Sequence, residues 1–295
     1  RNSSAALGDL QEQAKTMAAI ERAVGEPSDT GLQKKLATFW NSWAPNGLIY
    51  AYTTYLDRMA PHWDGLVLGN YTAVMPLTWN SKYGIPYLYQ PFLAAQLGVF
   101  GPETDAPLLD RFLEAIPRKF RYWDIYLNAG NQVAGSRFPL YRRTNFVLSP
   151  QPDYAILEAA YRENIRRNVR KALHQGCYPD SGFEVDKVIT LAMAQMNRHT
   201  HTTHDHIDRF RALYADLRTR QMATTYGIFS AAGELLSSAV FFFSHRRAYY
   251  ILVGNHPNGR TIGASHALID AFIRDHAGQN RVLDFEGSDL PNLAF

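Results

Sequence analysis

The feature that most constrains the fold is a strand, a small-residue segment, a helix and a second strand, in that order, near the end of the sequence. AYYILVGN predicts a strand over 248–255, and apolar residues at helical spacing from Ala267 predict a helix. RVLDFEG predicts the second strand over 281–287. Between them, Pro257–Gly259 is typical of a turn and Arg260–Ser265 of a small-residue loop. Unpaired amides at the helix N-terminus would then form an anion site.

Length and composition narrow the class of protein. The 295 residues allow one large domain or two of ordinary size, and 46% hydrophobic with 19% charged residues is typical of a globular protein. A net charge of +3 is too small to predict nucleic-acid binding from global electrostatics. The single cysteine, Cys177, excludes an internal disulfide framework and a cysteine-based zinc site. No apolar run approaches a membrane span, and the N-terminus lacks a signal-peptide layout, so we expect a reducing, cytoplasmic location.

Three parts are predicted along the chain. Residues 1–38 carry an apolar stripe at helical spacing and are predicted to form an N-terminal helical extension. The proline-rich segment Ser149–Asp153 predicts a boundary between a first half, 39–150, and a second half, 151–295. The second half begins with one predicted helix over 154–176, and more helices and antiparallel strands then lead into the segment above.

The element order of the second half resembles the GNAT N-acyltransferase fold, whose loop after the fourth strand holds the pyrophosphate of coenzyme A. Arg260-Thr-Ile-Gly263-Ala-Ser265 matches the first two fixed positions of the family pattern Gln/Arg-x-x-Gly-x-Gly/Ala and has Ser at the third. From about Phe39 onward the chain is also similar to the Fem-like branch, which joins two GNAT-type halves. The segments that carry this likeness are PNGLIYAYTTYLDRM with WDGLVLGN, AVMPLTWNSKYGIPYLYQPF with QLGVF, ENIRRNVRKALHQG, and LDFEGSDLPNLAF.

The resemblance implies an α+β fold of tandem GNAT-like (acyl-CoA N-acyltransferase) domains, with mixed, mostly antiparallel sheets flanked by helices. It also implies a bacterial-type acyltransferase that moves an acyl or aminoacyl group from a thioester or ester to a primary amine of a small molecule or peptide. Acyl-CoA is the favoured donor, and no metal is expected. Classical Fem members use aminoacyl-tRNA, so a tRNA-dependent peptidyltransferase is the alternative.

One departure from the GNAT pattern supports a third hypothesis. In GNAT enzymes a Tyr in the helix after the fifth strand often protonates the departing thiolate. The sequence ends at Phe295, where that helix is expected, so no residue of this sequence can be given that role. A ligand-binding protein that keeps the fold without the chemistry is therefore the third hypothesis.

The predicted donor site combines the strand and the loop. If the strand splays from its neighbour, as the resemblance implies, its backbone would hold the pantetheine arm. Backbone amides near Gly263, with Arg260 as charge partner, would hold the pyrophosphate. An ordinary strand–helix turn is the alternative. The predicted residues are Val253, Asn255, Asn258, Gly259, Arg260, Gly263, Ala264 and Ser265.

Two residues are predicted to act on the reacting groups. Asp284 and Glu286 share one strand face, and Glu286 is the leading base for an ammonium acceptor, which must be neutral to attack a carbonyl. A solvent-facing pair, or an Asp that caps the following turn, is the alternative. Tyr249 and Tyr250 are expected on opposite faces, one in the core and one at the acceptor site, and Tyr250 is the predicted catalytic residue.

Two further segments are predicted to contact substrate. Arg166 and Arg170 lie on one helical ridge with Arg162, where they would meet phosphates of a nucleotide, tRNA or cell-wall precursor; a solvated helix face is the alternative. The segment YGIPYLYQPF would form a rigid wall of a cleft between the halves, with Tyr87, Tyr89 and Gln90 as contacts, or pack as core.

The histidine-rich run HTHTTHDH, 199–206, invites a metal interpretation. It resembles part of the metallo-β-lactamase signature, but that signature requires Asp immediately before its third His. Thr203 stands at that place, and Asp205 follows His204 instead. Because the run bridges two predicted helices, Thr203 or Asp205 would more naturally be an N-cap, and no metal site is predicted.

Overall fold

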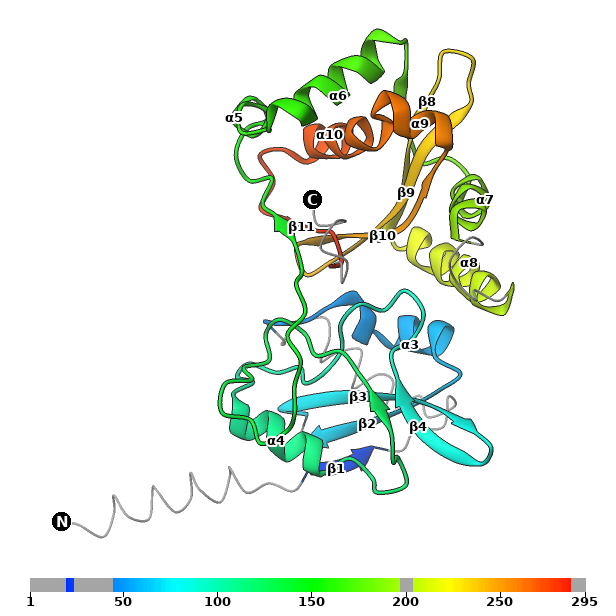
Figure 1. The fold of residues 1–295 in the computed structure, drawn as a ribbon. Coiled ribbons are helices and arrows are strands. Elements are labelled where there is room, and N and C mark those ends of the chain that lie inside the picture. The colour runs from blue at the N-terminus through cyan, green and yellow to red at the C-terminus, as the bar shows by residue number, and fades with distance from the viewer. Residues whose placement is uncertain (1–19, 24–44, 70, 197–203, 288–295) are drawn as a thin grey trace, which may run out of the picture. The chain divides into compact units, whose positions relative to one another are not determined.

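The computed structural model describes residues 20–23, 45–69, 71–196 and 204–287. The chain divides into two compact units, Arg1–Tyr141 and Arg142–Phe295, and each combines one sheet with helices (Figure 1). Among the described residues, no helix has the length and apolar character needed to cross a membrane.

The first unit is built on a five-stranded sheet in the order β1-β2-β3-β4-β5. Neighbours pair antiparallel except β5, which joins β4 in parallel. Ile20–Ala23 forms strand β1, so the predicted helical extension over 1–38 is wrong for these residues; the others up to 38 lie outside the described part. The remaining elements are η1 (Ile49–Ala51), α3 (Thr53–Met59), β2 (His62–Leu68), β3 (Ala73–Lys82), β4 (Ile85–Tyr89), α4 (Ala106–Glu114) and β5 (Trp123–Asp124).

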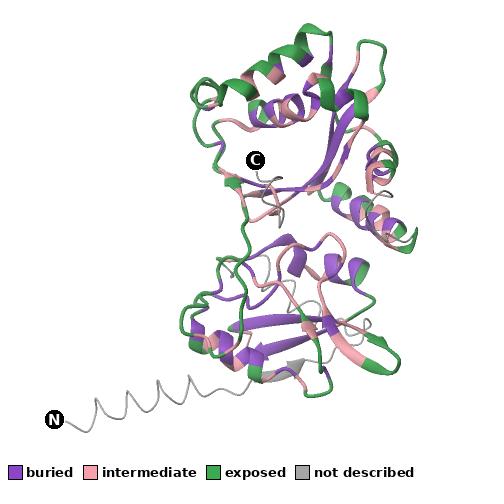
Figure 2. Ribbon diagram, in the orientation of Figure 1, coloured by how far each residue is buried: buried purple, intermediate pink, exposed green. Residues whose placement is uncertain are grey.

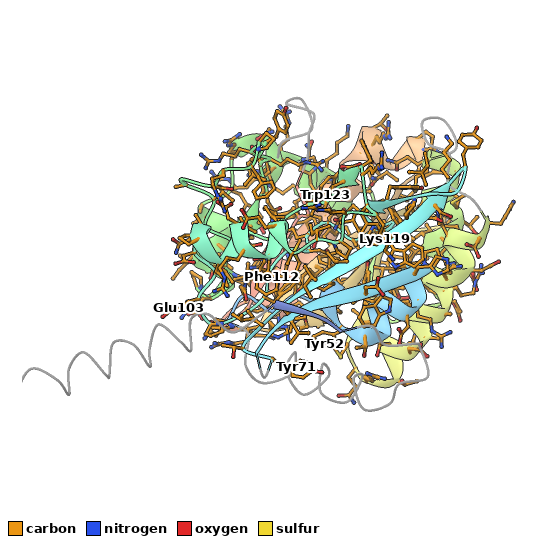
Figure 3. The ribbon with its side chains drawn as sticks, turned by 90° about the horizontal axis from the view of Figure 1, so that it is seen from below. Tyr52, Tyr71, Glu103, Phe112, Lys119 and Trp123 are labelled. Carbon is orange, nitrogen blue, oxygen red and sulfur yellow. The ribbon has the colours of Figure 1, made fainter. Side chains whose placement is uncertain are left out.

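Helix α4 follows from its local sequence and covers one face of this sheet. The Asp105 carboxylate accepts a hydrogen bond from the Leu108 amide (2.9 Å), and a proline stands in the first turn, so both start signals are present. Leu109 and Phe112 then recur at helical spacing and are buried in the core of the first sheet (Figures 2 and 3). The apolar stripe therefore fixes which side of α4 meets the strands.

The second unit is built on a six-stranded sheet in the order β6-β11-β10-β9-β8-β7. Only β10 and β11 pair in parallel, so the sheet is mostly antiparallel, as predicted. The strands are β6 (Val147–Leu148), β7 (Tyr178–Ser181), β8 (Ala223–Phe229), β9 (Leu235–Ser244), β10 (Arg247–Asn255) and β11 (Val282–Asp284). The helices are α5 (Tyr154–Ala159), α6 (Glu163–His174), α7 (Val185–Met196), α8 (His204–Thr219), α9 (Pro257–Ile262) and α10 (Ala264–His276).

Helices cover both faces of the second sheet. Successive strand residues point to opposite faces, and Phe241 and Phe242 on β9 show the consequence. The Phe241 ring stacks on Phe272 of α10 at 3.9 Å between centroids, whereas Phe242 stacks on Phe210 of α8 at 5.8 Å. The run FFF is therefore shared between two cores, and its strand is buried on both sides (Figure 2).

The boundary region differs in detail from the sequence prediction. Strand β6 precedes the predicted boundary Ser149–Asp153, yet it already pairs with β11 in the second sheet. The single helix predicted over 154–176 is two helices, because Arg162 is extended (φ −62°, ψ 148°) and forms the N-cap of α6. The Tyr154 hydroxyl of α5 donates to the Asp270 carboxylate of α10 (2.7 Å), which ties the separate first helix to the core.

A buried carboxylate joins three segments at the edge of the second sheet. Asp284 is 0% exposed, and its oxygens accept from the Arg247 guanidinium (2.5 Å), the Asn145 side-chain amide (2.9 Å) and the Glu286 backbone amide (3.0 Å). These bonds connect β10, β11 and the segment before β6. Because a buried charge without partners is costly, the three donors make Asp284 a structural residue.

Asp284→Ala should lower the free energy of unfolding by about 3–5 kcal/mol, because it leaves the Arg247 charge and two amide donors without their acceptor. Urea unfolding followed by circular dichroism measures the change. Asp124→Ala, at an exposed carboxylate on β5, is the matched control and should stay within about 0.5 kcal/mol of the unchanged protein. Equal stability of the two variants would contradict the structural role of Asp284.

Candidate functional site

The candidate site centres on the point where β10 parts from its parallel neighbour. Strand β11 pairs only with Arg247–Tyr249, whereas β10 continues to Asn255. On its other side β10 remains paired with β9 as far as Asn255, with a bulge between Tyr250 and Leu252. Within the described part of the chain, no strand pairs with the β11-side edge of β10 beyond Tyr249.

Backbone donors face this unpaired edge. The His256 amide donates to Leu236 of β9 (2.9 Å), and the Asn255 amide donates instead to the Gln195 side chain of α7 (2.9 Å). Amide directions alternate along a strand, so the Val253 amide points to the same side as that of Asn255. Helix α7 approaches closely because Gly254 has no side chain: an added Cβ would lie 2.6 Å from the Ala192 nitrogen.

The segment predicted as a turn and loop is a short helix, α9. The His256 ring accepts a hydrogen bond from the Asn258 amide (3.2 Å), and Pro257 occupies the first helical turn. This cap and proline favour a helix start over a loop. Gly263 ends α9 in the left-handed conformation (φ 81°, ψ 25°), and α10 begins at the next residue. The loop expectation for Arg260–Ser265 is therefore wrong, because only Gly263 lies outside the two helices.

The first backbone amides of α10 are the groups that the sequence predicts to bind an anion. The His266 and Ala267 amides both donate to the Gly263 carbonyl (3.1 Å each). Ala264 and Ser265 are the first two residues of α10, so their amides have no acceptor within that helix. The exposed Arg260 guanidinium lies one turn earlier and forms no ion pair among the described residues.

Both glycines of this segment are explained by close packing. A Cβ on Gly263 would lie 2.7 Å from Asn168 Cβ of α6, and a Cβ on Gly259 would lie 2.3 Å from the Leu236 carbonyl oxygen of β9. The Lys171 ammonium of α6 also donates to the Thr261 carbonyl (2.8 Å). The glycines therefore let α9 and α10 sit against their neighbours, a role that does not require a ligand.

The two tyrosines of β10 lie on opposite faces, as predicted. Tyr249 is fully buried, with its hydroxyl 3.0 Å from the Ser244 hydroxyl. Tyr250 is 8% exposed, and its ring packs on Phe241 and Phe285 at 5.3 and 6.0 Å between centroids. Burial raises the pKa of Tyr250, so the phenol keeps its proton at neutral pH. Both rings therefore belong to the core, and neither tyrosine is exposed at an acceptor site as one of them was expected to be.

Glu286 lies just beyond β11. Its backbone is left-handed (φ 65°), and its amide donates to Asp284, so Asp284 caps the turn that presents Glu286. Both carboxylate oxygens of Glu286 are shielded from solvent. The expected shared strand face ends at Asp284, because β11 does not reach Glu286. The alternative of a solvent-facing pair is wrong, since Asp284 is buried.

The predicted substrate residues of the first unit serve internal contacts. The Gln90 side-chain amide donates to the Ala94 carbonyl (2.7 Å) and accepts from the Tyr126 backbone amide (3.1 Å), so both of its polar atoms are occupied. Tyr87 and Tyr89 form an edge-on pair at 6.0 Å between ring centroids, and both are half-buried. Gln90 therefore holds the irregular chain after β4, and the tyrosines remain accessible in part.

The basic ridge of α6 is partly neutralised. Glu163 lies 3.4 Å from both Arg166 and Arg170. Arg162 is the extended N-cap and does not continue the helical ridge. The positive charge of Arg166 and Arg170, which the sequence predicts to meet phosphates, is thus partly offset by Glu163.

The histidine-rich run is only partly described. His199 and His201 lie outside the described residues, and His204 and His206 stand in the first turn of α8. Asp205 pairs with Arg209 one turn along (2.8 Å). Among the described residues, no group of three or more metal-binding side chains comes together.

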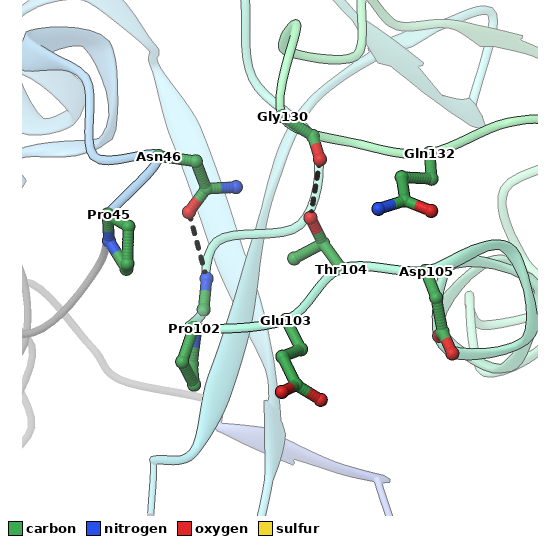
Figure 4. A pocket seen from close by; sticks show the side chains of 9 residues that line it. Pro45, Asn46, Pro102, Glu103, Thr104, Asp105, Gly130 and Gln132 are labelled. Atoms are coloured by element: carbon green, nitrogen blue, oxygen red, sulfur yellow. Dashed lines mark hydrogen bonds between the residues drawn. The ribbon is translucent and has the colours of Figure 1, made fainter.

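A polar cavity in the first unit escaped sequence reasoning. It measures about 520 Å³, within the range of small-molecule pockets (Figure 4). Asn46 accepts from the Gly101 amide (3.1 Å), and the Thr104 hydroxyl donates to the Gly130 carbonyl (2.7 Å). Its lining residues are Pro45, Asn46, Gly101, Pro102, Glu103, Thr104, Asp105, Gly130 and Gln132.

The sequence feature that could have pointed to this cavity is a group of asparagines that are buried in the fold. Asn128 and Asn131 both donate to the Val99 carbonyl (3.0 and 2.7 Å), and Asn46 does so as well (3.0 Å). Polar side chains in an apolar setting are retained when they fix the backbone. The dense asparagines of LNAGNQ, 127–132, mark this network in the sequence, but their common acceptor is evident only in the fold.

Comparisons with known proteins agree with this geometry. Residues 159–291 match the family described as acetyltransferase (GNAT) domain. The fold is similar to the crystal structure of FemX, with 14% identity over 92% of this chain and 90% of that chain, and a TM-score of 0.63. It is also similar to a conserved protein of unknown function from Bacteroides thetaiotaomicron VPI-5482 (11% identity, 93% of each chain, TM-score 0.53). L-PGS from Bacillus licheniformis is similar at 12% identity, over 92% of this chain and 80% of that chain, with a TM-score of 0.51.

A search of curated proteins finds no match to the chain. The family match covers most of the second unit, which is therefore similar to the acetyltransferase (GNAT) domain. The whole chain has the tandem, Fem-like GNAT fold, which confirms the resemblance and the predicted fold class.

Gly263→Ala should destabilise the protein by about 2–4 kcal/mol, because it adds left-handed strain to a clash with Asn168. Gly233→Ala is a close control: its φ is 82° and no atom lies within 4 Å of the added Cβ, so only the strain of about 1 kcal/mol applies. Urea midpoints give both values. Equal losses would contradict close packing at Gly263.

Proposed function

We propose that the protein is an N-acyltransferase that moves an acyl or aminoacyl group from a thioester or ester donor to a primary amine, with acyl-CoA as the favoured donor. The observation that carries the proposal is the unpaired edge of β10, which leads directly to the head of α10. The GNAT match of the second unit supports the class of reaction.

The donor is proposed to lie along this edge. A pantetheine arm carries amides that can pair with an exposed strand edge, and the Val253 amide faces that side. The phosphates would meet the Ala264 and Ser265 amides, the positive end of the α10 dipole and the Arg260 guanidinium. Asn255 contributes less than the sequence suggests, because its amide is bonded to Gln195 and its side chain accepts from Ser237.

The chemistry requires one proton acceptor and one proton donor. The amine nitrogen attacks the acyl carbonyl carbon, the bond to the leaving sulfur or oxygen breaks, and a backbone amide of β10 stabilises the oxyanion. Glu286 would take the proton from the acceptor ammonium, directly or through water. The leaving sulfur or oxygen would take its proton from water, because burial raises the pKa of the Tyr250 phenol and makes it a weaker acid.

Arg260→Ala should weaken acetyl-CoA binding about 10- to 100-fold, the worth of one charge-assisted hydrogen bond. Isothermal titration calorimetry measures this. S-acetylpantetheine lacks the phosphates, so its affinity should not change, and Arg220→Ala, another exposed arginine, should leave both affinities unchanged. If acyl-CoAs of several chain lengths give no heat with the unchanged protein, acyl-CoA is not the donor. Binding of aminoacyl-tRNA in that case would favour the Fem-type alternative.

Glu286→Gln should lower kcat about 10²- to 10⁴-fold with little change in donor affinity, because the amide cannot accept the ammonium proton. Turnover is measured with a panel of primary amines against rising pH. The variant should recover as pH approaches the pKa of the amine, since a neutral acceptor needs no base. Unchanged kcat would exclude Glu286 as the base, and donor binding without any product in the unchanged protein would support a non-catalytic role.

A further inference from the structure

The end of the first sheet where β3 turns into β4 carries exposed apolar side chains. Tyr83, at the turn, is 92% exposed, and Ile85, the first residue of β4, is 55% exposed. Tyr122, just before β5, is 64% exposed. Large apolar side chains are ordinarily exposed one at a time, so three at one end of a sheet indicate a partner surface.

Strand register brings these residues together. Lys82 pairs with Ile85 across the turn. The Leu88 amide donates to the Tyr122 carbonyl (3.0 Å), and Leu88 is in register with Trp123, so the segment before β5 runs beside β4. Trp123 packs against the core of this sheet, and its neighbour Tyr122 therefore points to the other face.

Four cations stand in the same two segments of the chain as these apolar residues. All four are exposed, and none forms an ion pair among the described residues. Lys119 lies over the rings of Trp79 and Phe120, at 5.0 and 4.7 Å from their centroids. The carboxylate of Asp124 is in register with Tyr89, at the far end of β4 from the turn. The cations are Lys82, Arg118, Lys119 and Arg121.

We propose that this surface, formed by Lys82, Tyr83, Ile85, Arg118, Arg121 and Tyr122, binds an anionic lipid membrane at its interface. Clustered lysine and arginine side chains are attracted to anionic head groups, and tyrosine is favoured at the boundary between head groups and acyl chains. Ile85 adds an aliphatic group that can enter the apolar layer. A nucleic acid would engage the cations and aromatic rings but offers no site for Ile85. The proposal stands independently of the transferase chemistry.

Vesicle flotation tests it with the full chain. The unchanged protein should float with vesicles of phosphatidylglycerol and phosphatidylcholine and not with phosphatidylcholine alone. Lys82→Glu with Arg121→Glu should weaken binding on the order of 30-fold or more, from about 1 kcal/mol for each cation. Tyr83→Ser with Ile85→Ser should weaken binding at high salt as well, where charge attraction is screened.

Arg220→Glu with Arg246→Glu makes the same change of charge at exposed positions of the second unit and should leave flotation unchanged. Circular dichroism verifies the fold of each variant. Absence of flotation by the unchanged protein, or equal flotation by the Lys82/Arg121 variant, would overturn the proposal. Loss of unfractionated tRNA binding in that variant, without any vesicle binding by the unchanged protein, would instead identify a nucleic-acid surface.

Discussion

The arrangement of the second unit depends on one buried carboxylate. Asp284 holds Arg247 of β10, Asn145 before β6 and the turn after β11, and it thereby fixes where the parallel pair ends. Because β11 stops at Asp284, β10 continues past Tyr249 with no strand of the described residues paired on that side. An unpaired strand edge presents backbone donors and acceptors that must otherwise bond to water or to a ligand. The same bonds that stabilise the sheet thus create the edge on which the donor proposal rests.

Three glycines allow the close packing of helices around the end of β10 and the start of α10. Gly254 admits the backbone of α7, Gly259 admits β9, and Gly263 admits α6. A side chain at any of these positions would separate a helix from the sheet or from its neighbouring helix. The head of α10 is therefore held by its surroundings, and its first amides keep a fixed direction. Such preorganisation is what electrostatic recognition of an anion requires, because no reorganisation accompanies binding.

Several elements followed from local pattern alone. The strand over 248–255, a shorter strand within 281–287 and the helix that contains Ala267 were predictable because period-two and helical spacing are properties of short windows. The break at Arg162 was not, since the separate α5 is held by its contact with α10. Helix α9 was missed although its start signals, the His256 cap and Pro257, are local. The roles of Asp284 and Gln90 also escaped, because their partners lie far away in the sequence.

The sequence by itself determined most of the strands and helices and the residue types available at the head of α10, since these follow from periodicity and motif spacing, and the resemblance of its segments to the Fem-like GNAT branch implied the fold class. Only the tertiary structure decided which polar groups are already occupied. In the structure, Asp284 and Gln90 form internal hydrogen bonds, Glu163 pairs with Arg166 and Arg170, and no strand of the described ranges pairs with the edge of β10 beyond Tyr249. The physical reason is that a hydrogen bond or ion pair belongs to two groups, and sequence specifies the groups without specifying which of them meet.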